Sequence, residues 1–177
     1  IPIALHSLSG TVLGVLLAFR TSQSYARFWA GRQLWADVAN SVRNLGRLAA
    51  ANCKPSRYEA LLRLMQAYPV ALRQHLRGQR DMDEFEPYLE TSEVNELSTA
   101  DNLPLALTLS MSVLLADLRT DPSPGGSYLW YSCNEQVTKL TEVIARSEAI
   151  AGTPLPLSYS RHTSRLLSIW TLLSPVM

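Results

Sequence analysis

Three side chains near the start of the chain, Thr11, Val15 and Phe19, recur every four residues. In an α-helix this spacing places them on one face, with a drift of about 40° per step. Repeated around a symmetric oligomer, such a face would form stacked rings of small or apolar side chains, and apolar constrictions can gate ions by dewetting. From the spacing alone, an ordinary lipid-facing or helix-packing surface is the better interpretation.

The residue types that usually carry catalysis form no pattern. His6, His75 and His162 lack the spacing of metal ligands, and the sequence contains no GxSxG, P-loop or GxGxxG motif. Glu59 and Glu148 are isolated carboxylates of the kind that cap helices or pair with arginine. We therefore expect no enzyme activity, no metal site and no cofactor.

Composition narrows the class further. The chain has 177 residues, of which 47% are hydrophobic and 18% charged, which favours one domain with a real core over disorder. A net charge of +1 argues against a nucleic-acid partner. Cys53 and Cys133 form no metal or redox motif, so we expect two reduced core thiols. Because the chain starts without Met and stops inside an apolar run, we expect it to be part of a longer protein.

Residues 1–19 hold no formal charge when His6 is neutral, and Arg20 ends the run. This length predicts a membrane-spanning helix, with a buried helix of a soluble protein as the alternative. Gly10 and Gly14 weaken a soluble helix but are tolerated in membrane helices. A basic flank follows, in which Asp37 is the one acid, and its arginines are Arg20, Arg27, Arg32, Arg43 and Arg47.

A second apolar run, residues 166–177, follows Arg161, His162 and Arg165. The positive-inside rule places both basic flanks in the cytoplasm or its equivalent compartment. We therefore expect 1–177 to be a single domain, with a membrane helix over 1–19, an extramembrane helical body over 20–165, and the start of the last membrane helix over 166–177.

Helical spacing runs through this body. After Ser24, one apolar stripe is expected to consist of Tyr25, Phe28, Trp35, Val38, Val42, Leu45 and Leu48. Ser56 and Glu59 have capping-box spacing, and the helix they begin is expected to kink near Pro69 and end at Gly78.

Further helices are expected towards the end of the chain. Residues 102–119 predict an apolar helix with Pro104 in its first turn, and 120–127 form a Pro/Gly turn cluster. A narrow packing seam then consists of Trp130, Cys133, Val137, Leu140 and Ile144. Gly152 closes that helix, and the last helix begins near Ser158 or Tyr159.

Residues 81–101 contain eight of the fifteen acidic residues and no Lys or Arg. The pattern predicts a solvated loop with short helical pieces, in which carboxylates without basic partners repel each other. A cation or partner site is the sharper alternative, although the D-x-D-x-D-G pattern of a calcium loop is missing. We expect this stretch to face water and to bind no ion tightly.

Two long motifs resemble the bestrophin family. The family's pore helix ends in an FR-x-N-x-x-Y-x-R-W/F-x-E-G/A-R-x-x-W pattern, which is matched here by Phe19, Arg20, Tyr25, Arg27, Phe28, Gly31, Arg32 and Trp35. Ser22 stands where Asn is common, and Ala30 where Glu is common.

The second motif, C-E-R/K-I-x-x-T-P-I/V-P-x-x-Y, is matched by Glu148, Ile150, Thr153, Pro154, Leu155, Pro156 and Tyr159. Ser147 replaces the usual Cys, and Ala149 the usual basic residue. The form of residues 154–165 is most similar to the plant and algal branch of the family.

The resemblance implies an all-α membrane protein with transmembrane helices and an extramembrane helical bundle. It also implies a homopentamer in the lipid bilayer around a central anion pore, with transport that is passive. Chloride is the implied permeant, bicarbonate a plausible second one, and the chloroplast thylakoid the implied location, with the plasma membrane as the alternative.

Residue by residue, the family's pore neck falls on Thr11, Val15 and Phe19, and its basic flank on Arg20, Arg27 and Arg32. Glu148, Pro154, Pro156 and Tyr159 are expected to have structural roles. The family's calcium-binding cluster lies beyond the last membrane helix, and its second constriction is not mapped onto this chain. A helical scaffold that does not conduct, membrane-attached or soluble, is the alternative function.

Overall fold

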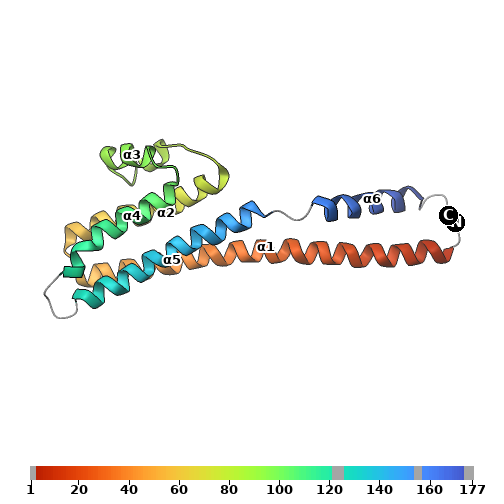
Figure 1. Ribbon diagram of the computed structural model, residues 1–177, viewed down its shortest axis with the longest axis horizontal. Helices are drawn as coiled ribbons and strands as arrows, with labels where there is room; N and C mark the ends of the chain where they lie inside the picture. The colour runs from red at the N-terminus through yellow and green to blue at the C-terminus, as the bar shows by residue number, and fades with distance from the viewer. Residues whose placement is uncertain (1–2, 121–125, 154–156, 174–177) are drawn as a thin grey trace. The chain divides into compact units, whose positions relative to one another are not determined.

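The computed structural model describes residues 3–120, 126–153 and 157–173, and these residues form helices and no strands (Figure 1). The helices, with two short 3-10 turns, are α1 (Ile3–Asn52), α2 (Pro55–Arg77), η1 (Asp83–Phe85), α3 (Thr91–Ser98), α4 (Leu103–Leu115), η2 (Ala116–Thr120), α5 (Gly126–Gly152) and α6 (Leu157–Leu173). The all-α class is therefore confirmed. The chain divides into two compact units, Ile1–Arg32 with Ile150–Met177, and Gln33–Ala149.

The predicted membrane spans fall on the start of α1 and the second half of α6. Within the described residues, no helix combines the length and the apolar character that crossing a membrane requires. The side chains of residues 1–6, which belong to the expected span over residues 1–19, lie outside the described part of the chain.

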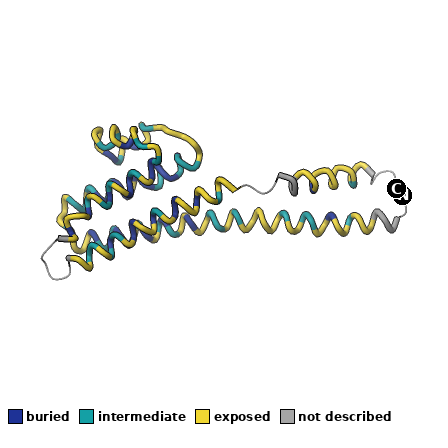
Figure 2. The backbone as a smooth tube through the Cα atoms, in the orientation of Figure 1, coloured by how far each residue is buried: buried dark blue, intermediate teal, exposed yellow. Residues whose placement is uncertain are grey.

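The larger unit, 33–149, has a continuous apolar core. Tyr68 of α2 is fully buried, and its hydroxyl donates a 2.7 Å hydrogen bond to the carbonyl oxygen of Leu140 in α5. Burial of this phenol raises its pKa. The same core contains four of the five predicted seam residues of α5, since Cys133, Val137, Leu140 and Ile144 are buried, whereas Trp130 is half-buried. Figure 2 shows the buried positions along α2, α4, α5 and the second half of α1.

Local signals account for several helix ends. Gly78 ends α2 in the left-handed conformation (φ 63°), as predicted. Asn102 caps α4, because its side-chain oxygen accepts a 3.1 Å hydrogen bond from the Leu105 amide. The capping box at Ser56 was a wrong prediction: α2 begins at Pro55, so Ser56 already lies inside the helix and the N-cap is Lys54.

The stripe predicted for α1 is correct only in part. Val38 and Leu45 are buried, but the buried line continues through Leu34 and Ala49. The aromatic members Tyr25, Phe28 and Trp35 are 63%, 61% and 41% exposed. Trp35 follows Leu34 directly, so it points about 100° away from the core-facing line.

The cysteines are free, as predicted, but only one belongs to the core. Cys133 is fully buried, whereas Cys53 is half-buried at the end of α1. Burial raises the pKa of Cys133 to about 11, with a smaller contribution from the nearby Cys53. A thiol with such a pKa stays protonated and unreactive at neutral pH.

Candidate functional site

The predicted neck residues lie on an exposed face of α1. Val15 and Phe19 are 51% and 61% exposed, and Thr11 is exposed as well. Leu13, in contrast, is only 6% exposed. At about 100° per residue, the three neck residues lie roughly 160–240° around the helix from Leu13. They therefore point away from the side of α1 that packs within its own unit, and Figure 2 shows this part of α1 as largely exposed.

The packed side of α1 contacts α6. A Cβ atom at Gly10 would lie 3.3 Å from Nε1 of Trp170, so a larger residue at position 10 would crowd the indole ring. Thr163, one of the α6 side chains in this unit, is 1% exposed. Glycine at position 10 therefore favours close approach of the two helices.

The hydroxyl group of Thr11 is hydrogen-bonded within its own helix. Its hydroxyl donates a 3.0 Å hydrogen bond to the Ser7 carbonyl oxygen, one turn earlier in α1. This hydrogen bond occupies the hydroxyl proton within the helix itself.

The three predicted arginines have different environments. Arg27 is occupied: its guanidinium donates a 2.5 Å hydrogen bond to the Ile150 carbonyl oxygen and another to that of Thr153. These carbonyls belong to the last turn of α5 and the residue after it, where helix carbonyls lack partners within the helix. Arg20 is half-buried and Arg32 is exposed. Only Arg32 presents its charge fully to solvent.

Three aromatic side chains of α1 lie close to one another just after the predicted neck residues. The Tyr25 and Trp29 rings are stacked, with centroids 6.4 Å apart and an angle of 13° between their planes. Phe28 lies 6.3 Å from Tyr25 in a tilted arrangement. These three rings are more than half exposed, so α1 presents an apolar surface directly after the neck residues.

Glu148 links three helices of the larger unit. Its Oε1 lies 2.7 Å from Nε2 of His75, in the last turn of α2, and accepts a 3.1 Å hydrogen bond from Nδ2 of Asn102. Asn102 is itself the N-cap of α4. One carboxylate of α5 therefore connects the end of α2 with the start of α4.

The remaining members of the second motif lie at the edge of what is described. Pro154 and Pro156 fall outside the described residues. Tyr159 belongs to α6, but its side chain is likewise outside the described part of the chain. Their expected roles depend on the sequence motif alone.

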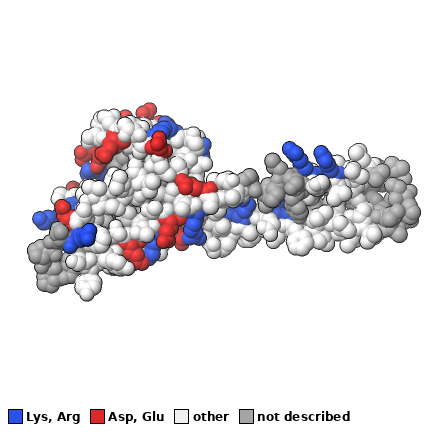
Figure 3. All heavy atoms as spheres, viewed as in Figure 1, with Lys and Arg blue, Asp and Glu red and all other residues white. Residues whose placement is uncertain are grey.

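The acidic stretch faces water, with seven of its eight acidic residues exposed and Glu93 half-buried. It contains η1 and α3, as the predicted short helical pieces require. Basic partners come from α2, because Arg63 pairs with Glu90 at 2.9 Å and Arg73 pairs with Glu84. In Figure 3 the red and blue side chains intermix over this region. The expectation that these acids lack basic partners was wrong, since sequence distance hid the α2 arginines.

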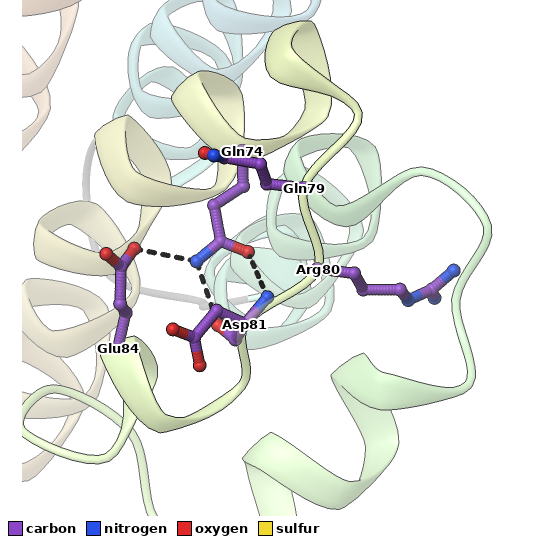
Figure 4. Close-up of a pocket in the computed structure, with 5 residues that line it drawn as sticks. All are labelled: Gln74, Gln79, Arg80, Asp81 and Glu84. Carbon is purple, nitrogen blue, oxygen red and sulfur yellow. Dashed lines mark hydrogen bonds between the residues drawn. The ribbon is translucent and has the colours of Figure 1, made fainter.

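A pocket of about 430 Å³ lies where α2 meets this stretch (Figure 4). Gln74 is 1% exposed there, and its amide nitrogen donates to Glu84 at 2.7 Å and to the Asp81 carbonyl at 2.8 Å. The Gln74 hydrogen bond, with help from Arg73, lowers the pKa of Glu84. Within the described residues no group of three potential ligands could hold a metal ion.

Sequence reasoning missed Gln74 and the partners of Glu148. Gln74 could have been noticed as a polar residue three positions after Ala71 and two after Leu72, on the apolar side of a helix. His75 carried no signal, because its partner is 73 residues away along the chain.

The described residues define an all-helical protein in which Thr11, Val15 and Phe19 lie on an exposed face of the first helix. The profile of the family described as Bacterial/Fungal Bestrophin protein matches residues 1–177. The chain belongs to the bestrophin family, as the two sequence motifs predicted.

Named relatives agree with this assignment. A voltage-dependent anion channel-forming protein of Nostoc sp. is 33% identical over 98% of this chain and 58% of its own length. The chloroplastic voltage-dependent chloride channel 2 of Arabidopsis thaliana is 31% identical over 97% of this chain and 42% of its own length. The chain therefore spans about half the length of these relatives.

The fold is also known from solved structures. A bacterial bestrophin homologue from Klebsiella pneumoniae superposes with a TM-score of 0.91, at 23% identity, over 98% of this chain and 66% of that one. The helix arrangement of this chain is thus a bestrophin fold.

Proposed function

We propose that this chain is part of a passive anion channel in which five copies surround a central pore. Chloride is the principal permeant and bicarbonate a second one, and the chain catalyses no reaction. Two relatives whose names describe anion or chloride channels support this proposal. The single observation that carries it is the exposed line of Thr11, Val15 and Phe19, opposite the side of α1 that packs.

In the proposed pore these residues form three rings. Neighbouring rings are about 6 Å apart at about 1.5 Å rise per residue, so the neck is roughly 12 Å long. An apolar neck gives an anion no fixed cation to bind tightly, which permits exit as well as entry. The positive edge of the Phe19 ring favours anions over cations. Wetting of the neck then controls whether ions pass.

The three arginines of the basic flank have different roles in this proposal. Arg32 is exposed and contributes its field to anion entry, and Arg20 contributes in part. Arg27 instead clasps the carbonyl oxygens of Ile150 and Thr153. Because an arginine fork fits two acceptors at once, Arg27 fixes the end of α5 against α1.

The second motif has a positioning role in this proposal. Glu148 connects α2, α4 and α5 through His75 and Asn102. From the sequence alone, we infer that the two prolines Pro154 and Pro156 limit the backbone freedom between α5 and α6, and that Tyr159, in the first turn of α6, shares this positioning role.

We place the channel in the thylakoid membrane. Support comes from the motif form of residues 154–165 and from the chloroplastic relative. A helix that lines a pore faces water and other helices as well as lipid, so it tolerates polar residues such as Ser7 and Ser9. Fractionation that finds the protein in the plasma membrane would favour the alternative location.

Bilayer recording tests the function. The full-length protein, purified in mild detergent and reconstituted, should carry a current whose reversal potential follows the chloride gradient. The same preparation with a neck variant such as Val15→Asp serves as the control for contaminating channels. Assembled protein that inserts but carries no anion current would identify a non-conducting scaffold.

A further inference from the structure

Two arginines of α1 in the larger unit have no role in its packing. Arg43 and Arg47 are exposed, and within the described residues neither has an ion-pair or hydrogen-bond partner. Other arginines of the same unit are neutralised by Asp or Glu: Arg57 by Asp117, Arg63 by Glu90 and Glu93, Arg73 by Glu84, and Arg146 by Asp37. Arg43 and Arg47 are therefore a local excess of positive charge.

Their direction follows from helix geometry. Leu45 is fully buried, and Ser41 and Ala49 on the same side are 2% and 0% exposed. At about 100° per residue, Arg43 and Arg47 lie roughly 160° and 200° around the helix from Leu45. They point straight away from the core of their own unit, with a rise of about 6 Å between them.

The surroundings of this arginine pair suit water better than protein or lipid. In the part of α1 that belongs to the larger unit, the exposed positions on the same strip are Ala36, Asn40 and Ala50, so no large apolar side chain accompanies the charges there. Interface cores are usually built on aromatic and other large side chains. An unpaired arginine is costly against lipid. A strip of arginine, asparagine and alanine is what an aqueous passage tolerates.

We propose that Arg43 and Arg47 line the anion path beyond the neck and raise the local concentration of anions there. This inference depends on the proposed channel function, because it assumes that the exposed strip of α1 faces the path. The pair acts through its electric field and not as a tight binding site. Each copy of the chain adds two positive charges to the same section of the path.

Salt dependence separates a field effect from a change of shape. The screening length is about 30 Å in 0.01 M salt and about 3 Å in 1 M salt. Replacing both residues, Arg43→Gln with Arg47→Gln, should lower the unitary chloride conductance about threefold at 20 mM KCl. At 1 M KCl the loss should be below about 1.2-fold, because screening removes the field.

Two matched variants complete the experiment. Arg43→Lys with Arg47→Lys keeps both charges and should conduct like the parent at 20 mM KCl. Lys54→Gln with Arg77→Gln removes two charges from exposed positions outside the strip and should leave the conductance unchanged. When KCl is lowered from 1 M to 20 mM, the conductance of the parent should fall by less than the KCl concentration does, and this measurement needs no variant.

The outcomes distinguish this inference from the proposed function. A parent that conducts no anions refutes both. A conducting parent overturns only the inference if the glutamine pair matches it at 20 mM KCl, or if the loss persists at 1 M KCl. An equal loss in the lysine pair or in the Lys54 and Arg77 control would do the same. Parent conductance that is strictly proportional to KCl concentration also overturns it.

Discussion

Replacing Glu148 by alanine removes one carboxylate that serves two partners. The contact with His75 is 2.7 Å long, and the two side chains are 43% and 24% exposed for Glu148 and His75. A hydrogen bond to a charged group contributes about 1.5–3 kcal/mol when buried, and exposure reduces that to about 1 kcal/mol here. The 3.1 Å bond from Asn102 adds about 0.5 kcal/mol. We expect Glu148→Ala to destabilise the fold by about 1.5 kcal/mol.

Thermal unfolding of the full-length protein in mild detergent measures this loss. For a cooperative unit of about 150–250 residues, about 1.5 kcal/mol corresponds to a Tm decrease of roughly 3–6 °C. Glu148→Gln should lose about half as much, because it keeps an acceptor oxygen but not the charge. Glu142→Ala is the matched control, since Glu142 is an exposed carboxylate of the same helix.

A double-mutant cycle with His75→Ala identifies the contact itself. The sum of the two single-variant losses in unfolding free energy should exceed the loss in the double variant by about 1 kcal/mol, because each single substitution already breaks the pair. If Glu148→Ala melts within about 1 °C of Glu142→Ala, or if the two losses simply add, the linking role of Glu148 is wrong.

Three further predictions concern the neck, the clasp and the acidic stretch. Phe19→Ala and Val15→Ala should raise macroscopic current, because less apolar surface must be wetted. Val15→Asp should suppress anion current by repulsion in a narrow pore. If all three variants assemble and conduct like the parent, the assignment of these residues to the pore neck is wrong. Arg27→Gln should lower the fraction of assembled protein on size exclusion, while the anion-to-cation permeability ratio of the remaining channels stays unchanged. Arg27→Lys should restore only part of the assembly, because an ammonium group lacks the two parallel donors of a guanidinium. A changed permeability ratio with normal assembly would instead mean that Arg27 contacts the ion. Glu84 has a lowered pKa in the folded state, so its contribution to stability is present above its unfolded pKa and is lost as pH falls through the folded value; acid unfolding of Glu84→Gln should therefore depend less on pH than that of the parent, and identical profiles would contradict the link.

Local signals predicted much of the helical framework. Gly78 ends α2 through a left-handed conformation, and Pro104 lies in the first turn of α4, both as predicted. Both depend on the properties of single residues, which is why they can be read without tertiary information. Ser56 shows the limit, since Pro55 occupies the first helical position and moves the start.

Contacts between distant segments could not be predicted. Arg27 was expected in a basic flank, yet its partners are carbonyl oxygens 123 and 126 residues away. Backbone acceptors carry no side-chain signature, so nothing in the sequence distinguishes an occupied arginine from a free one. The neck face could be predicted only as a choice between pore, lipid and packing surface, because spacing specifies a face but not what covers it.

Imaging of the full-length protein in mild detergent tests the central claim most directly. The account predicts particles with five-fold symmetry, in which Thr11, Val15 and Phe19 of each copy face the axis and form the narrowest section. A stable monomer or dimer, or five-fold particles in which these three side chains face lipid, would contradict it.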